Sequence, residues 1–369
     1  MTTVMVTGGL GFIGRYTVDL LTKQGYNVII IDNLVGQIHR DKNIELNNKK
    51  GVEFYRYDIR WTNKMKELIR RSEYIIHLSA YTGSAQSFWE VKKYTSNNAV
   101  GTASIFDLLI KEKSLRKNIK KIIYASSSYV YGEGAYLCSE HGIVFPPHRS
   151  FESLKKQEWD LYCPYCQGKL KSIGADEFKP IQSPNPYSLS KYYGEKLSLQ
   201  FGDVLDIPIT VFRYFNVYGA GQSQFNPYTG VIISFANRIK SGKSPIVYED
   251  GLMTRDFIDV RDIANANLYS LEKGHGIFNI GSGKPTSILR LAEMLCEKFG
   301  FKRGPELSND SRPGDIRNIF SNSSKFIKEF GYSGFIDINE GLDDFVEFYQ
   351  KVETKDNSSV AEWKRHHFF

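Results

Sequence analysis

Two side chains near the middle of the chain have the types and spacing of a proton-transfer pair. Tyr187 and Lys191 lie four residues apart in a stretch that begins with Pro186. Pro favours the first turn of a helix, and residues four apart share one helix face. A Tyr hydroxyl with its ordinary pKa of about 10 is a poor base at neutral pH, but a neighbouring ammonium favours the phenolate. Tyr187 is therefore a candidate general base, although the same spacing alone also suits a surface pair.

A second candidate site lies at the N-terminus, where Gly8, Gly11 and Gly14 recur at three-residue spacing between an apolar run and a helical pattern. Such glycines allow a tight turn, close approach to a pyrophosphate, and helix-on-strand packing. Asp32 ends the second apolar run, where its carboxylate can accept hydrogen bonds from ribose hydroxyls and repel the extra phosphate of NADP. The motif predicts an NAD site; the alternative is a tight turn without a ligand.

The elements that must carry these residues alternate in the first half of the chain. Short apolar runs, bounded by helical patterns, predict strands buried on both faces, as in a parallel doubly wound sheet. The expected strands are Val4 to Val6, Asn27 to Ile31, Val52 to Tyr57, Tyr74 to Leu78, Lys121 to Ala125 and, later, Ile277 to Ile280. We predict an α/β fold: a Rossmann doubly wound parallel sheet with a smaller mixed α/β substrate-binding lobe and a cysteine-containing insertion.

The same patterns predict where the parts of the chain begin and end. Helices are expected at Arg261 to Lys273, Ser287 to Lys298 and Ile338 to Val352. The predicted division is an NAD-binding Rossmann domain of residues 1–133 and 184–208, an insertion of residues 134–183, a lobe of residues 209–350 with some segments returning to the Rossmann domain, and a polar tail of residues 351–369.

A third motif, Ser126-Ser127-Ser128-Tyr129-Val130-Tyr131-Gly132, follows a predicted strand. With the glycine motif and the Tyr-Lys pair, it resembles the extended short-chain dehydrogenase/reductase family, especially its nucleotide-sugar epimerases and dehydratases, over nearly the whole chain. The resemblance implies that Ser127 acts with Tyr187 and Lys191. It also implies the following cofactor contacts: Gly8, Gly11, Phe12, Ile13, Gly14, Asp32, Asn33, Asp58, Ile59, Leu78, Ala80, Asn98, Tyr187 and Lys191.

Three further residues are assigned to the substrate by this resemblance. Asn216 lies in a family-like segment that contacts the nucleotide-sugar, and Arg255 and Arg312 lie in two others. A guanidinium is suited to a diphosphate because it is planar and permanently charged. Without the resemblance, these arginines would be read as surface partners of Asp256 and Asp315.

The residues next to the catalytic serine narrow the reaction. Dehydratases of this family place an Asp and a Glu where this chain has Ser128 and Tyr129, because loss of water needs an acid and a base. Elimination is therefore disfavoured. We predict an NAD-dependent epimerase that inverts C4 of a UDP- or dTDP-linked hexose through a transient 4-keto intermediate. The alternatives are an NAD(P)H-dependent 4-keto-sugar reductase, a 4,6-dehydratase, and a non-catalytic NAD-binding scaffold.

The insertion contains a pattern typical of a metal site. Cys138 and His141 form a CxxH pair, and Cys163 and Cys166 form a CxxC pair after 21 intervening residues. Four such ligands suit a closed tetrahedral zinc site that organises a polar loop; the alternatives are a metal-free loop and, less favoured, a redox pair. In this segment the chain is similar to bacterial epimerases that act on dTDP-L-rhamnose, which implies a 6-deoxyhexose substrate.

The composition limits the kinds of partner that the protein is expected to bind. The net charge of +7 comes from scattered Lys and Arg, which suits an anionic small substrate and predicts no nucleic-acid partner. The sequence begins without a signal-like segment and has no stretch of transmembrane length, so we expect a cytoplasmic protein without a membrane partner. Four cysteines are too few for a disulfide framework. The family resemblance implies a homodimer formed through helices at residues 99–111 and 186–201.

Overall fold

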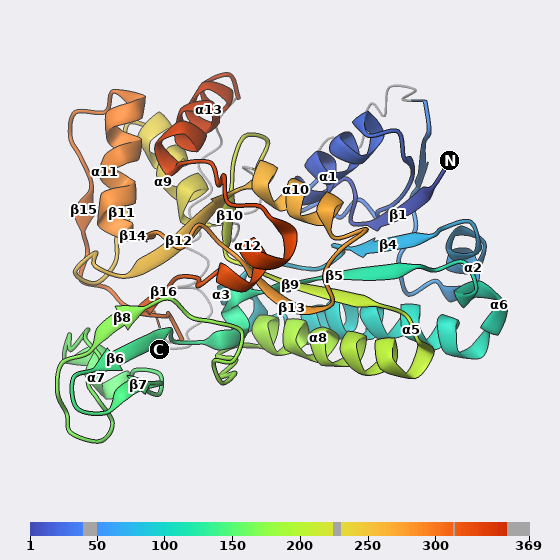
Figure 1. Cartoon of the computed structure of the whole chain (residues 1–369). Coiled ribbons are helices and arrows are strands. Elements are labelled where there is room, and N and C mark those ends of the chain that lie inside the picture. Colours follow the sequence, from blue (N-terminus) through green and yellow to red (C-terminus); the bar gives the residue numbers. More distant parts are fainter. Residues whose placement is uncertain (40–49, 224–229, 313, 353–369) are drawn as a thin grey trace.

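The computed structural model describes residues 1–39, 50–223, 230–312 and 314–352, and its centre is a seven-stranded sheet (Figure 1). The strand order is β13-β9-β5-β4-β1-β2-β3, and every neighbouring pair is parallel. The chain therefore winds in both directions from β1, as a doubly wound fold requires. The predicted fold class is confirmed.

The sequence predicts six of the seven strands of the large sheet to within two residues, and β9 (Ile209–Tyr214) is not among the predicted ones. The seven strands are β1 (Thr3–Thr7), β2 (Asn27–Ile31), β3 (Val52–Tyr55), β4 (Tyr74–His77), β5 (Lys121–Ser127), β9 and β13 (Gly276–Ile280). β5 continues to Ser127, two residues past the predicted end, because its whole length is buried. It therefore delivers the serine motif to the carboxyl edge of the sheet.

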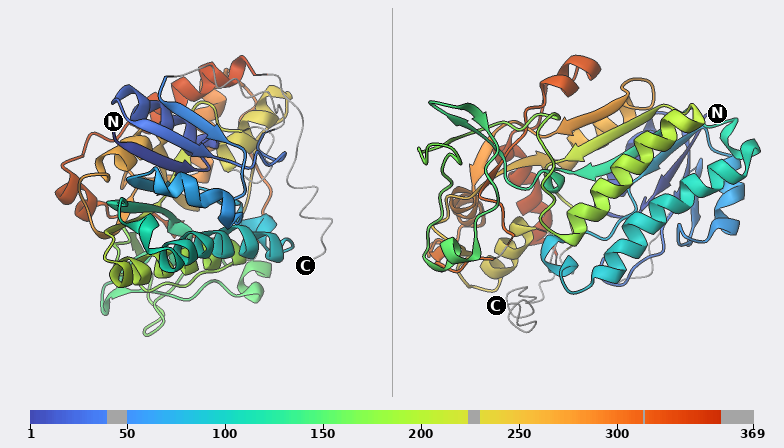
Figure 2. Two further views of the ribbon diagram at one scale, coloured as in Figure 1. Left: turned by 90° about the vertical axis from the view of Figure 1, so that its right-hand side faces the viewer. Right: turned by 90° about the horizontal axis from the view of Figure 1, so that it is seen from below.

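Helices cover both faces of the sheet (Figure 2). One face carries α1 (Phe12–Lys23), α10 (Val260–Tyr269) and α12 (Ser324–Phe330). The other carries α2 (Thr62–Arg70), α5 (Gly101–Lys111), α6 (Lys113–Arg116) and α8 (Pro186–Leu205). Successive strand residues alternate between these layers: Val4 and Val6 belong to the first core, and Met5 to the second. Both faces are buried, which explains why the strands are apolar throughout.

Short elements connect β4 to α5. They are α3 (Ser84–Ser87), α4 (Val91–Tyr94) and a π-helix, η1 (Thr95–Val100). A one-turn 3₁₀-helix, η2 (Ser128–Tyr131), follows β5. These segments lie next to α8, which places the loop after β4 beside the N-terminus of α8.

A second, smaller lobe packs around its own core. Its helices are α9 (Val231–Lys240), α11 (Ile288–Phe299) and α13 (Ile338–Gln350). Its strands are β10 (Asn216–Tyr218), β12 (Thr254–Asp259), β14 (Pro285–Ser287) and β16 (Asn318–Ile319) in one sheet, and β11 (Ile246–Val247) with β15 (Glu306–Leu307) in another. β9 and β13, from the same half of the chain, belong to the large sheet. The predicted polar tail falls almost entirely on residues 353–369, outside the described residues.

The segment predicted as an insertion forms a separate three-stranded sheet at one end of the molecule (Figure 1). Its elements are β6 (Ala135–Cys138), β7 (Gly142–Val144), α7 (Phe151–Lys155) and β8 (Lys171–Ile173). The small apolar cluster within it includes Cys138 and Cys163.

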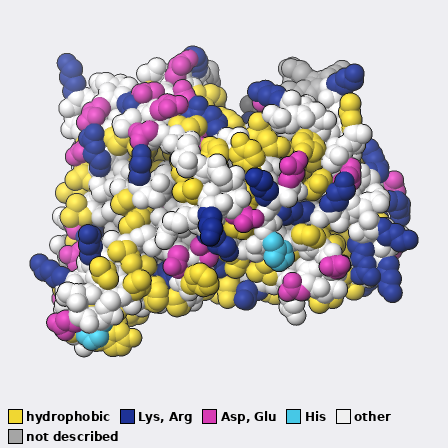
Figure 3. All heavy atoms as spheres, in the orientation of Figure 1, with side chains coloured by type: hydrophobic (Ala, Val, Ile, Leu, Met, Phe, Trp, Pro, Cys, Tyr) yellow, Lys and Arg dark blue, Asp and Glu magenta, His cyan; other side chains and the backbone are white. Residues whose placement is uncertain are grey.

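Within the described ranges, no helix is long and apolar enough to cross a bilayer. Figure 3 shows one face of the surface, where Lys and Arg gather at the end formed by α2 and α6 and are elsewhere mixed with acidic side chains.

Candidate active site

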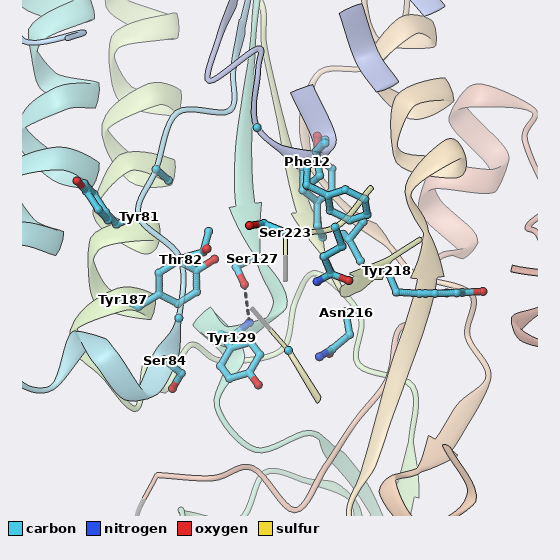
Figure 4. Close-up of a pocket in the computed structure, with 18 of the residues that line it drawn as sticks. Phe12, Tyr81, Thr82, Ser84, Ser127, Tyr129, Tyr187, Asn216, Tyr218 and Ser223 are labelled. Carbon is cyan, nitrogen blue, oxygen red and sulfur yellow. Dashed lines mark hydrogen bonds between the residues drawn. The ribbon is translucent and has the colours of Figure 1, made fainter. Parts of the chain in front are cut away.

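A cavity of about 500 Å3 lies between the large sheet and the second lobe. The glycine turn after β1 lines one end, the serine motif and α8 line the middle, and β10, α9 and β12 line the other (Figure 4). The cavity opens at the carboxyl ends of β1 and β4, where the strand order reverses and where such sheets bind their ligands.

The glycine turn is shaped by close backbone contacts. Gly8 has φ +69, and a Cβ added to Gly14 would lie 2.3 Å from the Gly8 carbonyl oxygen. Gly11 is the N-cap of α1 and provides no side-chain cap, so the N–H groups of the first helical turn remain directed toward the cavity. The turn therefore has the geometry that accepts an anionic group at a helix N-terminus.

Asp32 lies at the end of β2, beside this turn. Its carboxylate accepts hydrogen bonds from the backbone N–H groups of Leu10, at 3.2 Å, and Leu34, at 2.9 Å. Nε2 of His39 lies 3.6 Å from Oδ1 of Asp32. The carboxylate is thus held rigidly against the cavity wall, in the place where the ribose of a dinucleotide would need an acceptor. The glycine turn and Asp32 together fit NAD.

Tyr187 is positioned by the N-terminus of α8. The side chain of Asn185 accepts a hydrogen bond from the Ser188 N–H, and the Ser188 hydroxyl closes a capping box on the Asn185 N–H. Burial raises the pKa of Tyr187 to about 12, and a hydrogen bond with Ser127 partly opposes this increase. Tyr187 and Ser127 both face the cavity (Figure 4).

Lys191 lies one turn further along α8, with its Nζ 4.8 Å from the ring centroid of Tyr124. Burial lowers the pKa of Lys191 to about 7. The structure therefore brings Ser127, Tyr187 and Lys191 to one wall of the cavity, although Ser127 and Tyr187 are 60 residues apart in the sequence.

Most of the expected cofactor residues also line this cavity. They are Gly8, Gly11, Phe12, Ile13, Gly14, Asp32, Asn33, Leu78 and Ala80. Asp58, Ile59 and Asn98 are not among the described residues that line it. Their roles toward a cofactor stay predictions.

These three residues have other partners in the structure. Asp58 forms a two-point ion pair with Arg60, with N–O distances of 2.6 and 2.8 Å, and Ile59 packs under α5. Asn98 accepts a hydrogen bond from the Tyr81 N–H and donates to the Tyr81 carbonyl and the Ser190 hydroxyl. Asn98 therefore ties the loop after β4 to α8, which positions the cavity wall.

The expected substrate residues lie toward the second lobe. Asn216 begins β10, and its buried Oδ1 has no hydrogen-bond partner within the part of the chain that the structure describes. Arg255 is buried and donates to the carbonyl of Thr254 at 2.8 Å. The Arg312 guanidinium lies 4.3 Å from the ring centroid of Tyr248. All three line the cavity, and the two arginines bring positive charge to its second-lobe end.

Among the described residues, Arg255 does not pair with Asp256 and Arg312 does not pair with Asp315. Asp256 is instead buried and accepts hydrogen bonds from Ser282 and Ser321, and burial raises its pKa. Asp315 lines the cavity, and its backbone N–H donates to the Arg312 carbonyl at 3.1 Å.

Sequence reasoning did not single out several residues that line the middle of the cavity. They are Thr82, from the loop after β4, and Ser84, the first residue of α3. Tyr129, which the sequence indicated only as evidence against elimination, also lies here, with its ring centroid 6.5 Å from that of Tyr187 (Figure 4). An available signal was the position of this loop at the carboxyl end of a central parallel strand. The apolar wall at the second-lobe end, which includes Ile232 and Phe235, carried no such signal.

The four predicted metal ligands meet in the insertion. Their ligand atoms lie within 4.8 Å of one another, and the Sγ atoms of Cys138 and Cys166 are 3.6 Å apart. Nδ1 of His141 lies 3.7 Å from the Sγ atoms of Cys138 and Cys163. Two sulfurs bound at 2.3 Å to a tetrahedral ion lie about 3.8 Å apart, so this cluster fits one zinc ion. Cys138, Cys163 and Cys166 do not form disulfides with one another.

The doubly wound sheet, the uncapped glycine turn and the buried Tyr-Lys pair define a dinucleotide-binding enzyme of the short-chain dehydrogenase/reductase class. The chain belongs to the NAD dependent epimerase/dehydratase family, whose model matches residues 4–167 and 162–281. The family resemblance expected from the sequence is thus confirmed.

Similar proteins support this membership. A dTDP-L-rhamnose 4-epimerase from Burkholderia thailandensis is 30% identical over 346 residues, 92% of this chain and 92% of that protein. The solved structure of a UDP-glucose 4-epimerase from Thermotoga maritima with UDP-glucose has a TM-score of 0.76 and 28% identity, covering 95% of this chain and 99% of that one. A UDP-N-acetylglucosamine 4-epimerase from Methanobrevibacter ruminantium has a TM-score of 0.75 and 28% identity, covering 95% and 98%.

Proposed function

We propose that this enzyme inverts C4 of a nucleotide-linked hexose with NAD as a resident cofactor. The observation that carries the proposal is the convergence of Ser127, Tyr187 and Lys191 on a cavity with a glycine turn at one end and two arginines at the other. With NAD held at the glycine turn, a sugar bonded to a nucleoside diphosphate can lie along the rest of the cavity, with its diphosphate toward the arginines and its ring beside Tyr187. The 4-epimerase names of similar proteins agree with this arrangement.

Each side chain has a role that its position allows. Tyr187 removes the proton of the C4 hydroxyl, Ser127 shares a hydrogen bond with that oxygen, and Lys191 favours the phenolate by its charge. Bound NAD supplies the reversible oxidation of the sugar alcohol, so that a 4-keto sugar is formed and reduced again. Asn216, Arg255 and Arg312 hold the nucleoside diphosphate while the sugar turns over. Reduction from the other face then gives the inverted alcohol, without net redox change.

The residues after Ser127 favour this reaction over elimination. Ser128 is buried, and Tyr129 places a phenol at the position where a dehydratase needs a carboxylic acid. A reductase would use the same serine, tyrosine and lysine, but it would have to exchange its cofactor during turnover.

We infer that the sugar is a 6-deoxyhexose carried by dTDP. The support is the dTDP-L-rhamnose 4-epimerase at 30% identity, together with the cysteine-containing insertion. Relatives that act on UDP-glucose make UDP-linked hexoses the second candidate.

The function is tested by incubating the purified enzyme with dTDP-L-rhamnose, dTDP-glucose, UDP-glucose and a GDP-sugar, and by following C4 configuration by NMR. We expect a C4 epimer to form without added cofactor and without net change in NADH absorbance. Stoichiometric consumption of NADH would identify a reductase, and loss of water from the sugar would identify a dehydratase.

We also propose a structural zinc ion bound by Cys138, His141, Cys163 and Cys166. The support is the fit of their spacing to one tetrahedral ion. Zinc bound there would hold β6 and the CxxC turn together and complete the small core of the insertion.

We propose further that the enzyme is a cytoplasmic homodimer. The exposed side of α8 carries Leu189 at 55% and Tyr193 at 48% exposure, and Val100 beside it, at the end of η1, is 50% exposed. α5 packs beside α8, so two copies can bury these side chains in a four-helix contact. Four cysteines in 369 residues are too few for a disulfide framework, which supports a reducing compartment.

A further inference from the structure

A buried ion network connects the insertion to the cavity wall. Arg149, which precedes α7 in the insertion, is only 2% exposed in its side chain. Its guanidinium donates to Oε2 of Glu249 at 2.7 Å and to the backbone carbonyl of Asp315 at 3.0 Å. One side chain of the insertion therefore holds two segments of the second lobe.

The segment after Asp315 is held from the same side. The Glu133 carboxylate accepts the backbone N–H of Arg317 at 2.8 and 3.0 Å. The Arg317 guanidinium pairs with both oxygens of Asp250, at 2.6 and 2.7 Å, and with Asp160 of the insertion at 3.0 Å. The backbone of residues 315–317 is therefore held by Arg149 and Glu133, and the Arg317 side chain is held by Asp160 and Asp250.

This anchored segment carries Arg312 into the cavity. The Asp315 N–H donates to the Arg312 carbonyl at 3.1 Å, and the Asp315 carbonyl is the group that Arg149 binds. The Arg312 guanidinium lies over the ring of Tyr248, whose chain neighbour is Glu249. Arg149 thus holds the Asp315 backbone, which is hydrogen-bonded to Arg312, and also Glu249, the residue next to the aromatic ring beneath Arg312.

The energetics favour a geometric role for this network. Glu249 is fully buried and has φ +55, a left-handed conformation that costs free energy for any residue other than glycine. A buried ion pair is often replaceable by apolar groups without loss of stability. A strained, buried pair is therefore better explained by the position it imposes than by the stability it adds.

We propose that Arg149 is a positioning residue that sets the place of Arg312 at the diphosphate end of the cavity. The insertion then acts as the outer support of the substrate site, through the Arg149 to Glu249 pair. This inference rests on the proposed function, because it needs Arg312 to contact a nucleoside diphosphate.

The test measures binding of dTDP and UDP by calorimetry, so that it does not depend on turnover. We expect Arg149→Met to weaken binding of the preferred nucleoside diphosphate at least about tenfold and to raise KM for its sugar equally, with kcat changed less than about threefold. Arg149→Lys keeps the charge but cannot bind both acceptors, so we expect it to retain the melting temperature and still lose affinity. Arg290→Met, at an exposed arginine of α11, should retain wild-type affinity.

A double-mutant cycle with Arg312→Ala separates positioning from general damage. If Arg149 acts through Arg312, Arg149→Met should cause little further loss of affinity in the Arg312→Ala background. An equal loss in both backgrounds, or wild-type affinity in Arg149→Met and Arg149→Lys, overturns the inference. If the wild-type enzyme itself binds neither dTDP nor UDP, the proposed function fails instead.

Discussion

Tyr187 and Lys191 are both driven toward their neutral forms by burial. The pKa of Tyr187 is raised to about 12 and that of Lys191 is lowered to about 7, because each side chain loses its hydration. Positive charge near the phenol therefore has a large effect on its ionisation, since little water remains to screen it. Burial alone opposes ionisation of Tyr187, so the positive charges of protonated Lys191 and of bound NAD would have to lower its pKa toward the working pH.

The role of Tyr187 is tested by removing its hydroxyl. We expect Tyr187→Phe to reduce kcat at least about 100-fold. Among the described residues, Tyr187 is the phenol that both lines the cavity and lies one helical turn from Lys191. NAD content measured after denaturation should stay unchanged, since the glycine turn and Asp32 are intact. Tyr193→Phe, on the exposed side of the same helix, is the matched control and should retain activity. Wild-type turnover in Tyr187→Phe would show that another group is the base.

The buried His77, at the end of β4, makes the free energy of unfolding depend on pH. It is buried between the hydroxyls of Thr7, at 2.6 Å, and Thr102, at 3.0 Å. Burial, followed by the charge of Lys191, lowers the pKa of His77 to about 3. The unfolded chain binds a proton at this residue below its ordinary pKa of about 6.5, whereas the folded chain does not. The folded state therefore loses stability as the pH falls from 6.5 toward 3.

We expect this residue alone to account for about 2 kcal/mol of lost stability at pH 5 relative to pH 7. The measurement is urea unfolding at both pH values for the wild type and for His77→Gln. The variant should show a smaller difference between the two pH values, whereas His275→Gln, at an exposed histidine, should behave as the wild type. An identical pH dependence in His77→Gln would disprove the assignment.

At the scale of elements, helix ends and turns carry the chemistry. The N-terminus of α1 is uncapped where the cavity needs free N–H groups, whereas the N-terminus of α8 is closed by a capping box where Tyr187 needs a rigid position. The described part of the insertion has a small apolar core, and Cys138 at the end of β6 meets the CxxC turn within it. Each element is thus ordered by short-range contacts at its end.

Metal analysis of the wild type and of a cysteine variant tests the proposed zinc site. We expect about one zinc per chain in purified wild type by mass spectrometry of metals, and loss of that zinc in Cys163→Ser with a lower Tm. Cys296→Ser is the matched control, because Cys296 is equally a buried cysteine but lies in α11, away from the cluster. It should retain the metal. Equal metal content in the wild type and Cys163→Ser would refute the site.

At the scale of the whole molecule, the cavity lies between two bodies of structure, and the proposed dimer face lies on the opposite side of the sheet from α1 and α10 (Figures 1 and 2). Dimerisation through α5 and α8 would place the contact on the helix that bears Tyr187 and Lys191.

We expect Leu189→Asp to convert the dimer to a monomer in sedimentation velocity, because it places a charge in an apolar contact. Leu252→Asp is the matched control: Leu252 is also 55% exposed but lies in the second lobe, so this variant should remain dimeric. A monomeric wild type, or a dimeric Leu189→Asp, would exclude this interface.

The sequence alone predicted the fold class, the glycine turn and the grouping of Cys138, His141, Cys163 and Cys166. Strands buried on both faces need continuous apolar runs, a tight turn against Ser79 needs Gly8, and tetrahedral sites need closely paired ligands, so each leaves a short-range pattern. Only the tertiary structure revealed that Asn98 bridges the loop after β4 to α8, and that Arg149 pairs with Glu249, 100 residues away. Such contacts depend on how distant segments pack together. They have no short-range spacing pattern from which they could be predicted.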